Sequence, residues 1–281
     1  DKEAFATISH LTVGGFRDWL LSTEVTNEII LQTNKGITPE MAAAVSKIMS
    51  LQDLILVAQK IEVVSKFRTT VGLKGRFSTR LQPNHPNDDN KGIMASILDG
   101  LLYGCGDAVI GINPVSDSEE IAISILSMLE ELRLKFEIPM QSCVLSHYSL
   151  TKSIANRAPV DLLFQSIAGT QKANESFGVY LNDLAEAQEA ILALKRNPNS
   201  NQVFYFETGQ GTALSANAHA MIDQQTCEAR AYAVARKFNP FWACVEFRSQ
   251  FCAKLLAQSK VLDGQAGKSS RETRRKEICL V

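Results

Sequence analysis

The sequence predicts an α/β fold of the TIM (β/α)8 barrel type that is incomplete, with about five of the eight strands that a closed barrel needs. Two observations carry this prediction. Short apolar segments alternate with longer segments of helical periodicity, which is typical of a parallel sheet. In addition, each apolar segment ends in a polar residue just before the next helix. A purely helical stretch precedes the first strand.

The chain therefore divides into three predicted parts. Residues 1–70 form a helical N-terminal subdomain, residues 71–241 form the partial barrel with its active-site strand ends, and residues 242–281 form a divergent, basic tail that we expect to be disordered. A basic arm for interactions is the alternative for that tail. The expected strands are 77–82, 106–113, 142–147, 162–166 and 203–206. The expected helices of the barrel are 91–104, 117–136, 149–157, 171–195 and 213–236.

Local signals support several of these elements. In the N-terminal part, Thr38 and Pro39 are typical of a helix start, and Ser50 with Asp53 indicates another. These helices are expected without intervening strands.

The second strand ends at Asn113, and Pro114 fixes its exit because proline has no N–H to continue a central strand. Ser116 and Glu119 then predict a capping box that opens the next helix.

Composition excludes several classes of function. The chain has 281 residues, 45% of them hydrophobic, so it can bury one large core. Lys plus Arg number 29 and Asp plus Glu 30, a balance that argues against nucleic acid as a partner. No apolar run is long enough for a membrane span, and because the chain begins Asp1-Lys2-Glu3 we expect no signal peptide. The six cysteines form no C-x-x-C pair and the four histidines have no metal-ligand spacing, so we expect free thiols, no metal site and a cytoplasmic protein.

The most informative segment follows the last predicted strand. Its apolar run ends at Glu207, and Gly209 and Gly211 follow almost at once. In α/β barrels the chemistry lies at this end of the strands, so Glu207 is expected to be a partly desolvated, functional carboxylate. The other predicted strands also end in polar residues, which together indicate a polar pocket: Arg80 and Gln82, Asn113, His147, and Gln165 with Ser166.

These strand ends also carry a resemblance. The strings 77–84, 106–115, 164–167 with 177–179, and 205–215 closely resemble the large subunit of ethanolamine ammonia-lyase. The likeness runs from about residue 35 to Pro240, and the chain is expected to be truncated at both ends and divergent after Pro240. The D-x-H-x-x-G motif of another cobalamin-binding mode is absent from the sequence.

The resemblance implies a fold and an activity. That family's large subunit is a TIM barrel with a helical N-terminal part, which works with a small subunit and adenosylcobalamin. It converts ethanolamine to acetaldehyde and ammonia by radical migration of the amino group. The implied location is the cytoplasm or a bacterial microcompartment, and the implied assembly is a hetero-oligomer.

The resemblance also implies roles by position. Arg80 and Gln82, with the backbone near Leu81, match the strand end that holds the substrate, and Asn113 matches a substrate-binding amide. Glu207 matches the carboxylate that faces the substrate ammonium, and Glu207 with Arg80 is expected to be catalytic. The positions that match the cobalamin side are Pro114, Gln165 and Ser215.

Simple chemistry agrees with these roles, since a buried ammonium needs a charged acceptor and a hydroxyl needs donors and acceptors. Plainer alternatives stay open: a surface ion pair for Arg80, a turn for Asn113 and a helix cap for Gln165. His147 is more typical of a satisfied core histidine.

Three functions follow. The first is the lyase large subunit, with turnover expected to be impaired in this truncated polypeptide. The second is a non-catalytic truncated paralogue that binds lyase subunits. The third is another barrel lyase or isomerase that acts on a primary amine without cobalamin; cobalamin absorbance after reconstitution would distinguish it from the first.

Overall fold

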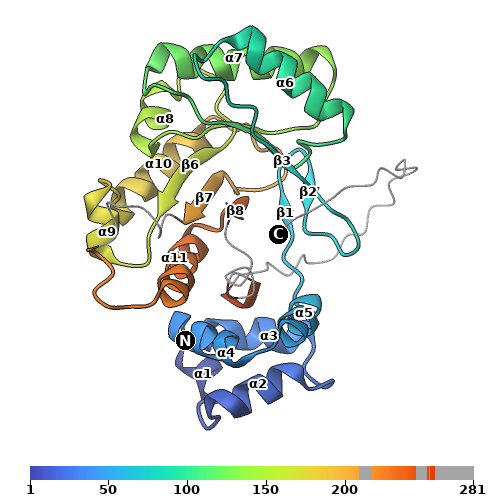
Figure 1. The fold of residues 1–281 in the computed structure, drawn as a ribbon, viewed down its shortest axis with the longest axis vertical. Coiled ribbons are helices and arrows are strands. Elements are labelled where there is room, and N and C mark those ends of the chain that lie inside the picture. The colour runs from blue at the N-terminus through green and yellow to red at the C-terminus, as the bar shows by residue number, and fades with distance from the viewer. Residues whose placement is uncertain (209–216, 245–251, 253, 257–281) are drawn as a thin grey trace.

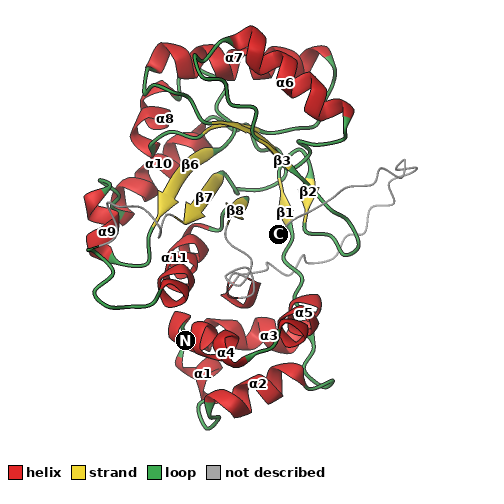
Figure 2. Ribbon diagram, in the orientation of Figure 1, coloured by secondary structure: helices red, strands yellow, loops and turns green. Residues whose placement is uncertain are grey.

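The computed structural model describes residues 1–208, 217–244, 252 and 254–256. A helical N-terminal part lies at one end of the molecule, and a curved sheet flanked by helices forms the rest (Figure 1). Figure 2 shows the same division by secondary structure. Of the predicted tail, residues 242–281, the segments 245–251, 253 and 257–281 lie outside the described residues.

Five α-helices build the N-terminal part. The expected start at Thr38 and Pro39 is confirmed, because the Thr38 hydroxyl accepts from Met41 N. The capping box of Ser50 and Asp53 is also confirmed. The helices are α1 (Lys2–Ala6), α2 (Val13–Leu21), α3 (Asn27–Thr33), α4 (Pro39–Ile48) and α5 (Leu51–Lys60), with a 3₁₀ turn at Asn34–Gly36.

The prediction that residues 1–70 contain no strand is wrong at its end. β1 (Ser65–Lys66) and β2 (Thr70–Val71) form an antiparallel hairpin. Lys66 N donates to Gln202 Oε1 over 2.8 Å, so the hairpin is tied to the segment that enters β7. The period-2 pattern is too short here to be detected in the sequence.

Within the described part of the chain, six parallel strands follow in chain order. β3 (Arg80–Leu81), β4 (Val109–Ile112) and β5 (Ser142–Val144) form one ladder, and β6 (Leu163–Ile167), β7 (Phe204–Thr208) and β8 (Trp242–Cys244) form another. Leu162 N donates to Ser142 O over 3.2 Å, which links the two ladders. The structure is therefore an α/β fold with parallel sheets, and the described residues do not close into a barrel.

The sheet has one strand more than the sequence predicts. β8 lies just after Pro240, where the predicted tail begins, and it pairs with β7 through Tyr205 and Trp242. It is only three residues long, so neither length nor alternation identifies it.

The helices between the strands match the predictions with several corrections. The capping box at Ser116 is wrong, because Ser118 is the N-cap of α7 and its hydroxyl accepts from Ile121 N. The single helix predicted over 171–195 is two helices with a turn at Gly178 between them, where φ is +68°. The last helix starts at Gln224, and the described residues 217–223 before it are not helical, whereas residues 213–216 of the predicted helix lie outside the described residues. These helices are α6 (Asn90–Leu102), α7 (Glu119–Lys135), α8 (Tyr148–Ile154), α9 (Gln171–Ser176), α10 (Leu181–Ala193) and α11 (Gln224–Phe238).

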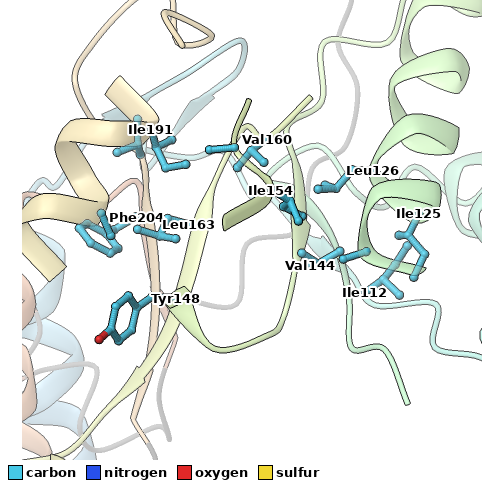
Figure 3. Close-up of a cluster of buried hydrophobic side chains, with 14 of the residues drawn as sticks. Ile112, Ile125, Leu126, Val144, Tyr148, Ile154, Val160, Leu163, Ile191 and Phe204 are labelled. Atoms are coloured by element: carbon cyan, nitrogen blue, oxygen red, sulfur yellow. The ribbon is translucent and has the colours of Figure 1, made fainter. Parts of the chain in front are cut away.

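Because side chains alternate along the strands, each of the two faces of the sheet has its own hydrophobic core. One lies between the strands and their helices, and Figure 3 shows part of it, with Val144 and Leu163 packed against helix residues such as Leu126 and Ile191. The other lies on the opposite face of the strands, here called the inner face. Its buried residues include Val109, Cys143, Leu145, Leu162, Phe164, Tyr205 and Trp242.

A charged network lies at the amino end of the strands. Asp161 is 1% exposed, and its carboxylate pairs with Arg68 at 2.6 Å and with Arg196 at 2.7 Å. Arg196 also pairs with Glu130 at 2.8 Å, and Arg133 donates to both oxygens of Glu130. This network fixes the end of the sheet opposite to the predicted site.

Candidate active site

Strand β7 supplies the centre of the site. Tyr205 and Glu207 project to the inner face because side chains alternate along a strand, whereas Phe204 and Phe206 belong to the core under the helices. Glu207 lies beside Ser166 of β6 in the register of the two strands. The sequence predicts Glu207 just after the strand, whereas the structure includes it in β7, one residue before the end.

Glu207 forms an ion pair with Arg80 of β3. Arg80 Nη1 donates to Glu207 Oε1 and to the hydroxyl of Tyr205. Tyr205 Oη in turn donates to the same Glu207 oxygen over 2.6 Å. Arg80 Cζ lies 5.8 Å from the centre of the Tyr205 ring, so the guanidinium also contacts the aromatic face. Three side chains from two strands are thus bound into one unit.

Burial differs sharply within this unit. Tyr205 is fully buried, whereas the side chains of Arg80 and Glu207 are 27% and 28% exposed. Burial raises the pKa of the Tyr205 phenol well above its usual value, and its hydrogen bond to Glu207 acts in the same direction. Tyr205 therefore stays protonated and remains a hydrogen-bond donor, while the charged pair reaches solvent.

Apolar residues form the floor below the charged pair. The rings of Phe164 and Tyr205 meet edge to face at 5.2 Å. The Cys143 thiol is fully buried, and burial followed by the negative charge of Glu207 raises its pKa. A Cβ atom at position 111 would lie only 2.8 Å from Leu145 Cδ1. Glycine at this position therefore leaves room for the Leu145 side chain in the floor. An uncharged floor strengthens electrostatic interactions at the site.

The other predicted substrate residues lie on the neighbouring strand ends. Gln82 is partly buried directly after β3, and Asn113 is exposed directly after β4. Asn113 N donates to Asn84 Oδ1 over 2.9 Å, which ties the loops after β3 and β4 together. The Leu81 side chain packs toward the helices, so its backbone alone is available to the site. Among the described residues, neither Gln82 nor Asn113 hydrogen-bonds to Glu207.

The residues predicted on the cofactor side are distributed differently. Pro114 is partly buried at the exit of β4. Gln165 is 4% exposed; its Oε1 accepts from Tyr148 N over 2.9 Å, and its Nε2 donates to Ser166 O over 2.9 Å. Gln165 thus supports the first turn of α8, which was the plainer alternative for this residue. Ser215 lies outside the described residues.

Tyr205 is the member of the site that the sequence analysis missed. The signal was present, because Tyr205 lies two residues before Glu207 on the same strand and so faces the same side. His147, set aside as a structural histidine, is the N-cap of α8, and its Nε2 hydrogen-bonds to Phe177 O.

The described part of the chain contains no group of acidic, cysteine and histidine side chains able to hold a metal ion. Within that same part, none of the helices combines the length and the apolarity that crossing a bilayer requires. The site presents a carboxylate that is 28% exposed, a guanidinium and a buried phenol. Such a set can pair with a cation and can donate hydrogen bonds to oxygen atoms.

The parallel strands, their flanking helices and the polar residues at the strand ends define an α/β protein with a candidate site at the carboxyl ends of its strands. Residues 1–247 match the family described as "Ethanolamine ammonia lyase large subunit (EutB)", and the chain belongs to this family.

Two curated relatives agree. The chain is 44% identical over 242 residues to "Ethanolamine ammonia-lyase large subunit" of Escherichia coli (strain K12), covering 86% of this chain and 53% of the relative. The values are the same for the protein of that name from Salmonella typhimurium (strain LT2). The chain thus spans about half the length of the curated relatives it matches. A Plasmodium falciparum HPPK-DHPS structure matches 81% of this chain and 54% of that chain, with 13% identity and a TM-score of 0.35, too low to carry an argument.

Proposed function

We propose that this chain supplies the substrate-binding strand ends of the large subunit of an adenosylcobalamin-dependent ethanolamine ammonia-lyase. The reaction converts ethanolamine to acetaldehyde and ammonia by radical migration of the amino group. The single observation that carries the proposal is the unit of Arg80, Tyr205 and Glu207 at the carboxyl ends of parallel strands, in a member of this family.

Glu207 is proposed to bind the substrate ammonium. Its Oε1 is held by Arg80 and Tyr205, whereas its Oε2 has no hydrogen bond within the described part of the chain. An ammonium is a strong donor without acceptor capacity, and pairing with a carboxylate offsets the cost of leaving water. The carboxylate is also placed to take up or return a proton as the amino group moves.

The substrate hydroxyl is assigned to three other residues. Arg80 offers guanidinium N–H groups beside Glu207, and Gln82 and Asn113 offer amides on the ends of β3 and β4. A hydroxyl both donates and accepts, and an amide can satisfy either need. Ethanolamine, with its two polar ends separated by two carbons, suits a site whose carboxylate and amides lie on neighbouring strand ends.

The open face of the site fits a large cofactor. Arg80 and Glu207 keep more than a quarter of their surface exposed, and Asn113 beside Pro114 is exposed as well. A bound group can cover these side chains and exclude water. We assign the contacts to Pro114, to the second amide hydrogen of Gln165 Nε2, and to Ser215. Adenosylcobalamin supplies the radical when bound; the residues of the chain bind, orient and shield the substrate.

We further propose that the sheet is part of a TIM barrel. Adjacent strands lie about 4.8 Å apart, so a flat sheet would separate β3 and β7 by roughly 19 Å over four spacings. The Arg80–Glu207 pair spans these strands, which requires strong curvature toward the inner face. The charged pair thus supports the curvature of a barrel.

The partners proposed for this chain are ethanolamine and the small subunit of the lyase, in a hetero-oligomer located in the cytoplasm or a bacterial microcompartment. The non-catalytic paralogue is not favoured, because the chain retains the charged strand-end pair rather than apolar replacements.

Two measurements test the proposal. Calorimetric titration should show that ethanolamine binds at least tenfold more tightly than 1,2-ethanediol, its uncharged counterpart, because only ethanolamine pairs with Glu207. With the small subunit and adenosylcobalamin added, the chain should release acetaldehyde and ammonia. Equal affinity for the two ligands, or no binding of ethanolamine, would contradict the proposal.

A further inference from the structure

Tyr205 lies directly beneath the charged pair and contacts both members. Its hydroxyl accepts from Arg80 Nη1 and donates to Glu207 Oε1 over 2.6 Å. One phenol oxygen therefore connects the cation and the anion from the side of the apolar floor. Neither the family resemblance nor the polar strand ends assigns a function to this residue.

We propose that Tyr205 is a positioning residue that fixes the carboxylate of Glu207 so that Oε2 faces the ligand. The inference rests on the proposed function, since it concerns how Glu207 meets the substrate ammonium. Arg80 and Tyr205 both act on Oε1, and together they define the rotation of the carboxylate about its last bond. Oε2 is left for a donor that arrives from the open side.

The phenol is itself held rigidly. Tyr205 is 0% exposed, and its ring meets Phe164 edge to face. The register of β7 and β8 places it beside Trp242. A buried ring packed on several sides has little rotational freedom, so the direction of its O–H is set before a ligand arrives.

Arg80 alone would not define this geometry. Its guanidinium is partly exposed, and a long exposed side chain pays entropy to stay in one position. The phenol supplies a short, stiff connection from the strand itself, because Tyr205 and Glu207 are two residues apart on β7. It holds the carboxylate even when Arg80 turns toward the substrate hydroxyl.

Tyr205→Phe removes the hydroxyl and keeps the ring, and it therefore tests the proposal. Ethanolamine affinity, measured by calorimetric titration of the purified chain, should fall about tenfold, the scale of one lost hydrogen bond to a charged group. The affinity for 1,2-ethanediol should stay unchanged, because that ligand makes no ion pair with Glu207. Tyr148→Phe is the matched control, since it removes the hydroxyl of another buried tyrosine, which bonds Asp183 on the helix side. Ethanolamine affinity should stay at the wild-type value.

The outcomes separate the inference from the proposed function. Loss of affinity for both ligands to the same extent, or no loss at all, would overturn the role of Tyr205 while the binding of ethanolamine by the wild-type chain stands. Failure of the wild-type chain to bind ethanolamine would overturn both. If Tyr205→Phe does not fold, a crystal structure of the wild-type chain with ethanolamine provides the test. We expect the Tyr205 hydroxyl to bond one oxygen of the Glu207 carboxylate, Oε1, and the ammonium to bond the other, Oε2. The reverse arrangement would contradict the inference.

Discussion

Arg80 and Glu207 are 127 residues apart in the sequence and form an ion pair across the inner face of the sheet. The pair joins the first and the fifth of the six parallel strands. It therefore depends on the curvature of the whole sheet, and it places a cation and an anion at the same strand-end surface. Neither side chain is fully buried, so the pair is accessible to a ligand.

Arg80→Met should destabilise the fold modestly. The substitution removes the cation and leaves the half-buried Glu207 carboxylate with Tyr205 as its donor, at a cost of about 1–2 kcal/mol given the partial exposure of the pair. The midpoint of urea unfolding measures this change. Arg157→Met breaks the exposed pair with Glu119 and should leave the midpoint unchanged. Equal shifts of the midpoint in the two variants would show that the Arg80–Glu207 pair stabilises the fold no more than an exposed pair does.

Gln165→Leu tests whether the Gln165 side chain stabilises the fold through its hydrogen bond to Tyr148 N. Leucine is close in size but offers no acceptor for Tyr148 N, which would stay buried without a partner at the start of α8. The free energy of unfolding should fall by about 1–3 kcal/mol. Gln171→Leu, which removes the exposed amide bonded to Glu175, is the control and should have no measurable effect. A Gln165→Leu variant as stable as the wild type would mean that the bond is dispensable.

Acid should weaken the fold through Glu130. The hydrogen bond from Arg133, aided by Arg196, lowers the pKa of this carboxyl from 4.5 to about 2, although burial opposes the shift. Between these values the unfolded chain binds a proton that the folded chain does not, so stability is present above pH 4.5 and is lost as the pH falls toward 2. The share of Glu130 is on the order of 3 kcal/mol at neutral pH.

Urea unfolding at a series of pH values measures that loss. Glu130→Gln should be less stable than the wild type at pH 7, and the difference should shrink as the pH approaches 2. Asp223, whose pKa is also lowered to about 2, titrates in both proteins and cancels in the comparison. A difference that stays constant from pH 7 to pH 2 would contradict the assignment.

One pattern in the sequence predicts both the α/β class of the fold and the proximity of Arg80 to Glu207. Apolar strands that end in polar residues are a local pattern, and parallel strands bring such ends to one side. The roles proposed for Gln82 and Asn113 stay predictions, because their side chains lie on strand ends without a contact to Glu207. The residue pattern predicts which side chains lie near one another at the carboxyl ends of the strands. It does not predict which of their atoms form hydrogen bonds.

Other features could not be predicted because their cause is tertiary. The hairpin of β1 and β2 and the strand β8 are held by partners far along the chain, such as Gln202 for Lys66 and Tyr205 for Trp242. The start of α7 at Ser118 rather than Ser116 reflects a choice between two nearby serines with similar capping ability. Tyr205 was missed for another reason, since a buried aromatic residue in a strand is usually part of the core.

Titration of Glu207→Gln with ethanolamine tests the central claim most directly. Glutamine keeps the size of the side chain and removes the charge, so we expect at least a hundredfold loss of affinity. Glu186→Gln, which alters an exposed pair on α10, should bind like the wild type. Wild-type affinity in Glu207→Gln would contradict the claim that this carboxylate receives the substrate ammonium.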